Sequence, residues 1–343
     1  MRLSVDGASV GFDAGNGHVH DLRVAGARGE IAPLHRAHWV GQGGLPPDLP
    51  PVEERLEGDF LCAPFGAHGQ AGVPPHGWPA NSAWHVTEAA GGHLSARLDR
   101  LAQGARVEKR LRLVPGQPAL YQTHGVSGGQ GRLSVAHHPM FRLSPGDRVR
   151  LSPKRLFLTP PSPLEPGRNW LCCPARSEDP AHFPGLRGPV DLSRYPEETG
   201  HEDFAVAVEG AGRRFGWTAL LRLQAGDLIL ILKDAAVLPL TMLWWSNGGR
   251  DRAPWSGRHL GVLGVEDGCA APGGLSLTAE GLPEGLDLAP GRTHRLRHAI
   301  LAAPLPAGWS DVTNVEPVAQ GLRVTADGGQ DLVLPFDSGF FDG

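Results

Sequence analysis

Short stretches in which apolar and polar side chains alternate recur along this chain. Residues 107–114 (VEKRLRLV) place apolar positions and one lysine on one face and mostly charged positions on the other. A period of two is typical of a β-strand with one buried face. The same period occurs in residues 132–135, 204–210 and 215–223, and the continuous apolar run at 226–234 has the length of a strand inside a sheet.

Helical periodicity is weak, and the only candidate helices lie near residues 192–199 and 293–300. Residues 41–57 form a proline-rich connection. Residues 152–200, which are rich in proline and have little periodicity, predict a long loop or insertion of the kind that often carries function. Since no internal repeat or compositional break divides the chain, we expect one domain over residues 1–343.

Glycine (48) and proline (32) make up nearly a quarter of the 343 residues. Such a chain is either disordered or rich in turns. Nine tryptophans, eleven phenylalanines and a hydrophobic content of 41% argue against disorder. Turns between short strands are therefore indicated, as in residues 321–336, which predict two strands around a Gly-Gly turn. The pattern predicts an all-β fold.

The charge and cysteine content exclude several classes of protein. With a formal net charge of -4 and no basic stripe, the chain is not expected to bind nucleic acid. Its apolar runs are far shorter than the roughly 20 residues that span a bilayer, and its first residues lack the apolar core of a signal peptide. We therefore expect no membrane partner and a cytoplasmic location, provided the chain is complete. Without CxxC spacing, free thiols are expected rather than disulfides or a zinc knuckle at Cys62, Cys172, Cys173 and Cys269.

Histidine, tryptophan, arginine and carboxylate residues gather beside the predicted strand ends, where a sheet can direct side chains into a cleft. Aromatic faces mixed with hydrogen-bonding groups suit a sugar, whose hydroxyls surround an apolar ring face. No phosphate-binding GxxxxGK[ST] motif and no dinucleotide-binding context occur, so no organic cofactor is expected. The segments that carry these residues are 58–70, 74–84, 136–143, 200–204 and 243–258.

Two adjacent carboxylates, Glu266 and Asp267, follow the apolar positions of residues 260–265. They are open to two interpretations. The first is a strand that ends at the protein surface, where carboxylates are common. The second is a catalytic base at the rim of a cleft.

The order of several motifs resembles the galactose mutarotase-like (aldose 1-epimerase) superfamily over roughly residues 5–305. Each motif is short, and the resemblance rests on their succession along the chain. The similar segments are SVDGASVGFDAGNGHVHDLRVAG (4–26), LCAPFGAHG (61–69), HGWPANSAWHV (76–86), HHPMFRL (137–143), GVEDGCA (264–270) and LDLAPGRTHRLRHAI (286–300).

This resemblance implies a large antiparallel β-sandwich of the supersandwich type with an open carbohydrate cleft. It also implies interconversion of sugar anomers by acid–base ring opening. Glu266 would be the base that takes the proton of the anomeric hydroxyl, and His138 the acid that protonates the ring oxygen. Each such group contributes about 10²–10⁴-fold to a rate. His76 would form a hydrogen bond with the sugar, whereas His137 is expected to be structural because neighbours in a strand point to opposite faces.

The remaining positions depart from the family pattern. The family's loop arginine falls at His68, and its aspartate falls at His201, where Glu202 or Asp203 could serve instead. Trp245 and Arg258 are further candidate sugar contacts. These departures, together with Met140, Arg142 and Asp267 at motif positions, indicate a different sugar or a sugar derivative.

Two other functions remain open. The chain could be a non-catalytic carbohydrate-binding protein of the same fold. It could also be a metal enzyme, because it has 16 histidines and an HVH sequence at residues 18–20, although no glutamate follows at the required spacing. The favoured interpretation expects a small carbohydrate as partner, no metal ligands, and a monomer or homodimer.

Overall fold

Antiparallel sheets account for nearly all of the regular structure. The computed structural model describes residues 1–27, 29–66, 72–212, 215–272, 275–282, 284–327 and 330–342. Within these ranges the strands form five sheets, joined by one short helix and three 3₁₀ turns. The elements are β1 (Arg2–Val5), β2 (Ala8–Phe12), β3 (Val19–Gly26), β4 (Gly29–Ile31), α1 (Pro51–Glu54), β5 (Leu61–Cys62), η1 (Trp78–Ala80), β6 (Trp84–Ala90), β7 (His93–Leu98), β8 (Ala105–Leu113), β9 (Ala119–Gly128), β10 (Gly131–Leu133), β11 (Ala136–His137), β12 (Met140–Arg142), β13 (Arg148–Leu151), β14 (Lys154–Leu158), β15 (Arg176–Ser177), η2 (Pro180–His182), β16 (His201–Glu209), β17 (Phe215–Arg222), β18 (Asp227–Asp234), β19 (Leu240–Asn247), β20 (Val262–Gly268), η3 (Thr278–Glu280), β21 (Leu286–Leu288), β22 (Thr293–Pro304), β23 (Asn314–Val318), β24 (Gly321–Thr325) and β25 (Leu332–Leu334).

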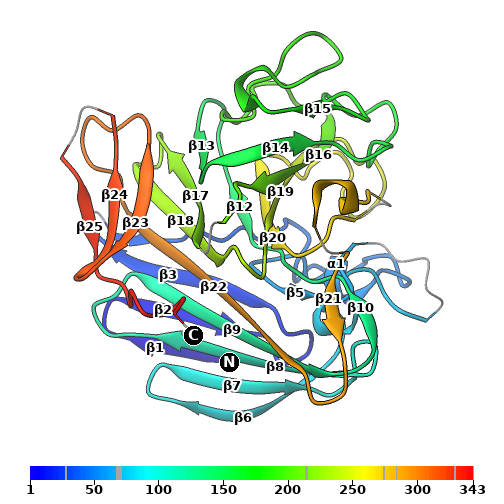
Figure 1. Cartoon of the computed structure of the whole chain (residues 1–343), viewed down its shortest axis with the longest axis vertical. Coiled ribbons are helices and arrows are strands. Elements are labelled where there is room, and N and C mark those ends of the chain that lie inside the picture. The colour runs from blue at the N-terminus through cyan, green and yellow to red at the C-terminus, as the bar shows by residue number, and fades with distance from the viewer. Residues whose placement is uncertain are drawn as a thin grey trace.

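Two eight-stranded sheets form a sandwich (Figure 1). Sheet I has the order β15-β14-β16-β19-β20-β11-β5, with β12 also paired to β20. Sheet II has the order β13-β17-β18-β22-β9-β8-β7-β6. The smaller sheets are β1–β4, β10 with β21, and β23–β25. The all-β prediction is confirmed.

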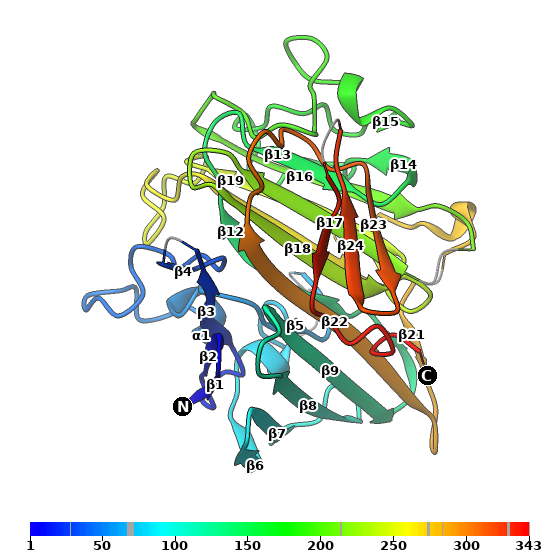
Figure 2. The same cartoon turned by 90° about the vertical axis from the view of Figure 1, so that its left-hand side faces the viewer.

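The apolar residues gather in three layers. The first lies between sheets I and II and contains Leu243 and Leu263 from sheet I and Ile229 and Ile300 from sheet II. We call the face of sheet I that points into this layer its inner face. The second layer covers the opposite, outer face of sheet I, and includes Met242. The third layer lies between sheet II and β23–β25, which Figure 2 shows in front of β17 and β18. Full burial of each such side chain contributes about 1.5–3 kcal/mol.

The strand predictions agree with the structure wherever the alternation was long. The stretches at 107–114, 204–210 and 215–223 correspond to β8, β16 and β17. The apolar run at 226–234 is β18, which lies between β17 and β22 and is buried through Lys233. The predicted turn of residues 321–336 joins β24 to β25, but Gly328 and Gly329 lie outside the described residues.

Both weak helical predictions are wrong. Residues 293–300 belong to β22, whose exposed Arg295 is followed by buried Leu296 and His298 on the inner face. Residues 192–199 form turns and an isolated bridge. Within the predicted loop at 152–200, the structure has the strands β14 and β15 and the turn η2.

The structure also bears on two features of the composition. None of the helices among the described residues is long and apolar enough to cross a membrane. All four cysteines are free, and Cys62 and Cys269 are buried.

Candidate functional site

A histidine and a glutamate lie directly opposite each other on the outer face of sheet I. β11 pairs with β20 at Ala136 and Gly268, and β12 resumes the same antiparallel register four residues later. This register sets His138 opposite Glu266. Their side chains meet, with His138 Nε2 3.1 Å from Glu266 Oε1, and they are 5% and 3% exposed. The two residues that the family resemblance singles out, 128 positions apart in the chain, are therefore in contact.

The local sequence makes room for this contact. Pro139 has no N–H, so the ladder is interrupted beside His138, while the carbonyl of Pro139 accepts a hydrogen bond from the N–H of Val265 at 3.0 Å. Gly264 precedes Glu266 by two residues and so faces the same side. A Cβ there would lie 2.9 Å from Glu266 Oε1 and 3.1 Å from Cε3 of Trp244. Glycine is thus required for the carboxylate and the indole to fit.

Aromatic rings enclose the imidazole of His138. Phe60 stacks on it with ring centroids 4.6 Å apart, and Trp244 meets it edge-on at 5.5 Å. His76 is also perpendicular to it at 5.0 Å. The ring of His138 is therefore fixed on several sides.

His76 is held by an unusual backbone and by a thiol. Its φ of 62° lies in the left-handed region, which few residues other than glycine adopt. Its Nδ1 lies 3.2 Å from Sγ of Cys62, and burial raises the pKa of that thiol. The thiol thus remains protonated and able to donate a weak hydrogen bond. These contacts turn the half-buried imidazole of His76 towards His138.

A second carboxylate, Glu202, lies on the same outer face. It accepts hydrogen bonds from Nε1 of Trp244 at 2.7 Å and from Oγ of Ser246 at 3.1 Å. Nε of Arg250 is 3.0 Å from it. Burial raises the pKa of Glu202, and the nearby Arg250 opposes this rise. Trp244 therefore links Glu202 to the His138–Glu266 pair.

The charge of the Arg250 guanidinium lowers the pKa of both members of this pair. The guanidinium lies over the ring of Trp255, 4.3 Å from the centroid, and 5.4 Å from that of Trp244. Next to these rings, His259 Nδ1 lies 2.8 Å from Oγ of Ser246. The outer face thus combines aromatic surfaces and imidazoles with the carboxylates of Glu266 and Glu202 and the guanidinium of Arg250.

Burial shifts the pKa values of the two members of the pair in opposite directions. Burial raises the pKa of Glu266 well above its ordinary value, which Arg250 partly opposes. Burial lowers the pKa of His138 to about 4. These shifts favour a protonated carboxyl group beside a neutral imidazole. Transfer of that proton within the pair would give a carboxylate and an imidazolium without changing the net charge.

The inner face of sheet I carries a second set of imidazoles and carboxylates at the neighbouring positions. The same register sets His137 opposite Asp267. Nδ1 of His137 donates to Oδ2 of Asp59 at 3.1 Å, and Nε2 of His298 lies 3.2 Å from Oδ2 of Asp267. His137 is thus placed among structural contacts.

Within the described part of the chain, Asp59, His137 and His298 form the one group whose ligand-type atoms all lie within 4.8 Å of one another, as a metal ion would require. The geometry is that of hydrogen bonds instead. Oδ2 of Asp59 already accepts from His137 and, at 2.5 Å, from Nε2 of Gln122. The rings of His137 and His298 are stacked at 4.1 Å and 12°, so their lone pairs lie in nearly parallel planes.

Three expected sugar contacts lie away from the His138–Glu266 pair. Trp245 and His201 point to the inner face, because each is one residue from a residue of the outer face, Trp244 and Glu202 respectively. Nδ1 of His201 lies 2.7 Å from Oδ2 of Asp203. Arg258 is exposed, whereas the next residue, His259, is buried beside Ser246.

One prediction falls outside the structure, and some site residues were not predicted. His68 lies outside the described residues. Trp244 and Arg250 lie within the segment 243–258 but were not predicted individually, and His259 directly follows that segment. Choosing Trp244 requires knowing which face of β19 it occupies, whereas Arg250 and His259 lie in the connection between β19 and β20, where no strand pattern applies.

Comparison with solved structures supplies an independent view of the fold. The protein Slr1438 from Synechocystis sp. PCC 6803 superimposes with a TM-score of 0.59 at 14% identity, covering 89% of this chain and 95% of that one. A galactose mutarotase-like protein from Lactobacillus casei gives a TM-score of 0.58 at 12% identity, covering 88% of this chain and 99% of its own. A galactose mutarotase related enzyme from Lactobacillus acidophilus gives 0.57 at 12% identity, covering 88% and 96%.

Comparisons of sequence alone give no such likeness, since no family model and no curated protein sequence matches this chain. The shared features are therefore those of the architecture: an antiparallel sandwich matched over almost the whole length of the solved proteins. This chain has the galactose mutarotase-like β-sandwich fold.

Proposed function

We propose that this protein is an aldose 1-epimerase-like isomerase that interconverts the anomers of a sugar or sugar derivative. The observation that carries the proposal is the contact between His138 Nε2 and Glu266 Oε1 at 3.1 Å, on a face rich in aromatic rings. Anomer exchange needs a base at the anomeric hydroxyl and an acid at the ring oxygen, two atoms bonded to the same carbon. A carboxylate and an imidazole in contact match that spacing.

The reaction would proceed by ring opening. Glu266 as carboxylate removes the proton of the O1 hydroxyl, while His138 as imidazolium donates a proton to the ring oxygen O5. The electrons of the O1–H bond form the C1=O1 double bond as the C1–O5 bond breaks, which gives the open-chain aldehyde. After rotation about C1–C2, the reverse transfers close the ring in either configuration. No net proton is gained or lost.

Several neighbours would hold the sugar. His76, directed by Cys62, would donate to or accept from a hydroxyl group. Trp244 would face the apolar side of the ring, and Arg250 and Glu202 would bind further hydroxyls. Because Glu266 and His138 are almost fully buried, a sugar reaches them only when surrounding side chains move. Its hydroxyls would then replace the direct contact within the pair.

The pair's proton predicts the pH dependence. Activity requires one proton on the pair, so it falls when a second proton is added at low pH or when the only one is lost at high pH. With the pKa of His138 lowered to about 4 and that of Glu266 raised, the rate should be high between these limits. The two limbs belong to the pair as a whole. A profile that is flat from pH 3 to pH 10 would contradict this assignment.

The test is anomer exchange followed by NMR. A panel of hexoses, pentoses, hexose phosphates and uronic acids is measured with the wild type, with Glu266→Gln and with the exposed control Glu88→Gln. We expect faster exchange than in buffer for at least one sugar, lost in Glu266→Gln and kept in the control. Sugar binding without acceleration would support a carbohydrate-binding protein instead.

A further inference from the structure

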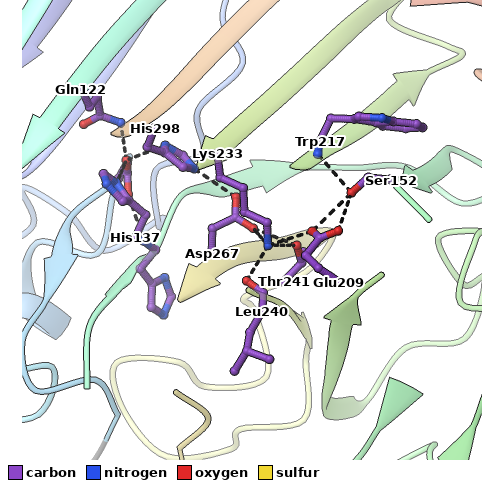
Figure 3. Close-up of polar contacts among 12 residues, drawn as sticks. Gln122, His137, Ser152, Glu209, Trp217, Lys233, Leu240, Thr241, Asp267 and His298 are labelled. Atoms are coloured by element: carbon purple, nitrogen blue, oxygen red, sulfur yellow. Dashed lines mark hydrogen bonds and ion pairs between the residues drawn. The ribbon is translucent and has the colours of Figure 1, made fainter. Parts of the chain in front are cut away.

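Behind the candidate catalytic pair, a chain of buried charged and polar groups crosses the space between the two sheets (Figure 3). Gln122, His298 and Lys233 are neighbours in one row across β9, β22 and β18 of sheet II. His137, Asp267 and Thr241 form the facing row of sheet I.

These buried groups form a continuous series of contacts. Lys233 lies 3.0 Å from Asp267 and 3.1 Å from Glu209. Asp267 accepts from Thr241 Oγ1 at 2.8 Å and meets His298, and Glu209 also contacts Lys154. In Figure 3, Lys233 and Asp267 lie between His137, His298 and Gln122 on one side and Glu209 and Ser152 on the other.

One member, Asp59, contacts the main chain of the proposed acid. Its Oδ1 accepts a hydrogen bond from the backbone N–H of His138 at 3.0 Å. Its Oδ2 accepts from Nδ1 of His137 and from Nε2 of Gln122. Asp59 itself is fully buried and tied to the neighbouring sheet, since its N–H and C=O both pair with Val19 at 2.8 Å. The carboxylate is thus fixed from three sides.

We propose that Asp59 is the positioning residue of His138, acting from the opposite face of sheet I. Its carboxylate fixes the peptide that carries the imidazole, and its negative charge favours the protonated form of that imidazole. Since it lies on the inner face, it does not touch the sugar. The proposal rests on the proposed function for its catalytic meaning, but the link from Asp59 to His138 stands on its own contacts.

The charge of Asp59 is held constant by its surroundings. The imidazoles of His137 and His298 and the amide of Gln122 keep the pKa of this carboxyl well below its usual range despite burial. The titratable or charged groups that face His138 from other elements are Glu266 on β20, His76 and Cys62 near β5, and Arg250 after β19. None of these four groups forms the hydrogen bond that the carboxylate of Asp59 forms with the backbone N–H of His138.

The experiment compares Asp59→Asn with Glu209→Gln, a matched loss of one buried carboxylate at the far end of the same chain of contacts. The pKa of His138 is read from NMR of histidine-labelled protein, with His138→Asn used to assign the signal. We expect Asp59→Asn to lower the pKa of His138 and Glu209→Gln to leave it unchanged. In anomer exchange, Asp59→Asn should lower kcat about 10-fold, as loss of an outer-shell partner does at metal sites, with KM unchanged and the low-pH limb moved to lower pH.

The outcomes separate this proposal from the proposed function. If no sugar is turned over, the NMR titration still tests the link between Asp59 and His138. An unchanged pKa of His138 in folded Asp59→Asn would overturn the proposal and leave Asp59 with a purely structural role. The His138 amide also lies 3.0 Å from the carbonyl oxygen of Phe60, so if Asp59→Asn does not fold, the wild type is tested by NMR couplings across the hydrogen bond. A coupling from the His138 amide to the side-chain carboxyl carbon of Asp59 supports the bond, and a coupling to the carbonyl carbon of Phe60 alone refutes it.

Discussion

The two faces of sheet I carry the same kinds of side chain at neighbouring positions and shift the pKa values of their carboxyl groups in opposite directions. On the outer face, burial raises the pKa of Glu266 and lowers that of His138. On the inner face, Lys233 and His298 hold the pKa of Asp267 well below its usual range in spite of burial. Environment rather than residue type therefore decides the role of each carboxylate.

The difference has a simple physical origin. A buried carboxylate is tolerated as an anion only when cations and donors surround it. Asp267 has a lysine at 3.0 Å, a hydroxyl and an imidazole. The side chain of Glu266 meets a neutral imidazole, with Arg250 farther away. The inner face is thus suited to holding the sheets together, and the outer face to moving a proton.

The largest effect should come from replacing Glu266, the proposed base on the outer face. Glu266→Gln replaces a carboxyl group, whose neutral form burial favours, by a neutral amide of the same shape. We expect kcat for anomer exchange to fall about 10²–10⁴-fold, while the free energy of unfolding changes by less than about 1 kcal/mol. Denaturant unfolding beside NMR kinetics measures both. A loss of stability as large as the loss of activity would refute the division between the two faces.

The next largest effect should come from the adjacent residue on the inner face. Asp267→Asn leaves Lys233 with Glu209 as its only close carboxylate among the described residues. Breaking a buried pair of this kind destabilises a protein by about 3–5 kcal/mol. Urea unfolding monitored by tryptophan fluorescence gives the value. Ser152→Ala, which removes one hydroxyl that donates to Glu209, is the mild control and should lose about 1 kcal/mol.

A smaller effect distinguishes the two adjacent tryptophans of β19. Trp244→Phe removes the N–H that donates to Glu202 at 2.7 Å and leaves a buried acceptor short of a partner, which costs about 1–3 kcal/mol. Trp245→Phe removes an N–H that has no hydrogen-bond partner among the described residues. It should therefore destabilise less in thermal unfolding. Equal losses would show that the indole of Trp244 contributes by packing alone.

The smallest effect is a slope against pH. Burial lowers the pKa of His35, like that of His138, to about 4, whereas an unfolded histidine titrates near 6.5. The unfolded state thus takes up protons first as the pH falls, so the stability that these residues contribute is present above pH 6.5 and lost between about pH 6.5 and 4. Each histidine contributes a slope of up to about 1.4 kcal/mol per pH unit. His35→Gln should reduce the measured slope between pH 6.5 and 4 by up to about 1.4 kcal/mol per pH unit. The exposed control His85→Gln should leave the slope unchanged.

The sequence predicted the strands better than it predicted their faces. Long alternation in residues 107–114 and the apolar run at 226–234 defined β8 and β18, because burial there follows a simple pattern. In β19 every position is buried, so the pattern contains no parity from which to choose between Trp244 and Trp245. A shift of one residue exchanges the faces.

The other residues of the site also lie in segments whose hydrophobic pattern does not reveal a face. Glu202 and His201 begin a strand that is buried throughout. Glu266 and His138 were placed by the succession of motifs, which carries register information that hydrophobicity lacks. Asp59 gave no signal, because its importance depends on a contact with the backbone of a residue 79 positions away.

The most direct test of this account is the rate of anomer exchange per folded molecule in Glu266→Gln and in Asp267→Asn, measured by NMR on the same sugar at the same pH. The account predicts that the first variant loses at least about 100-fold, while the second, once corrected for its folded fraction, stays within about tenfold of the wild type. Equal losses in the two variants, or a greater loss in Asp267→Asn, would contradict it.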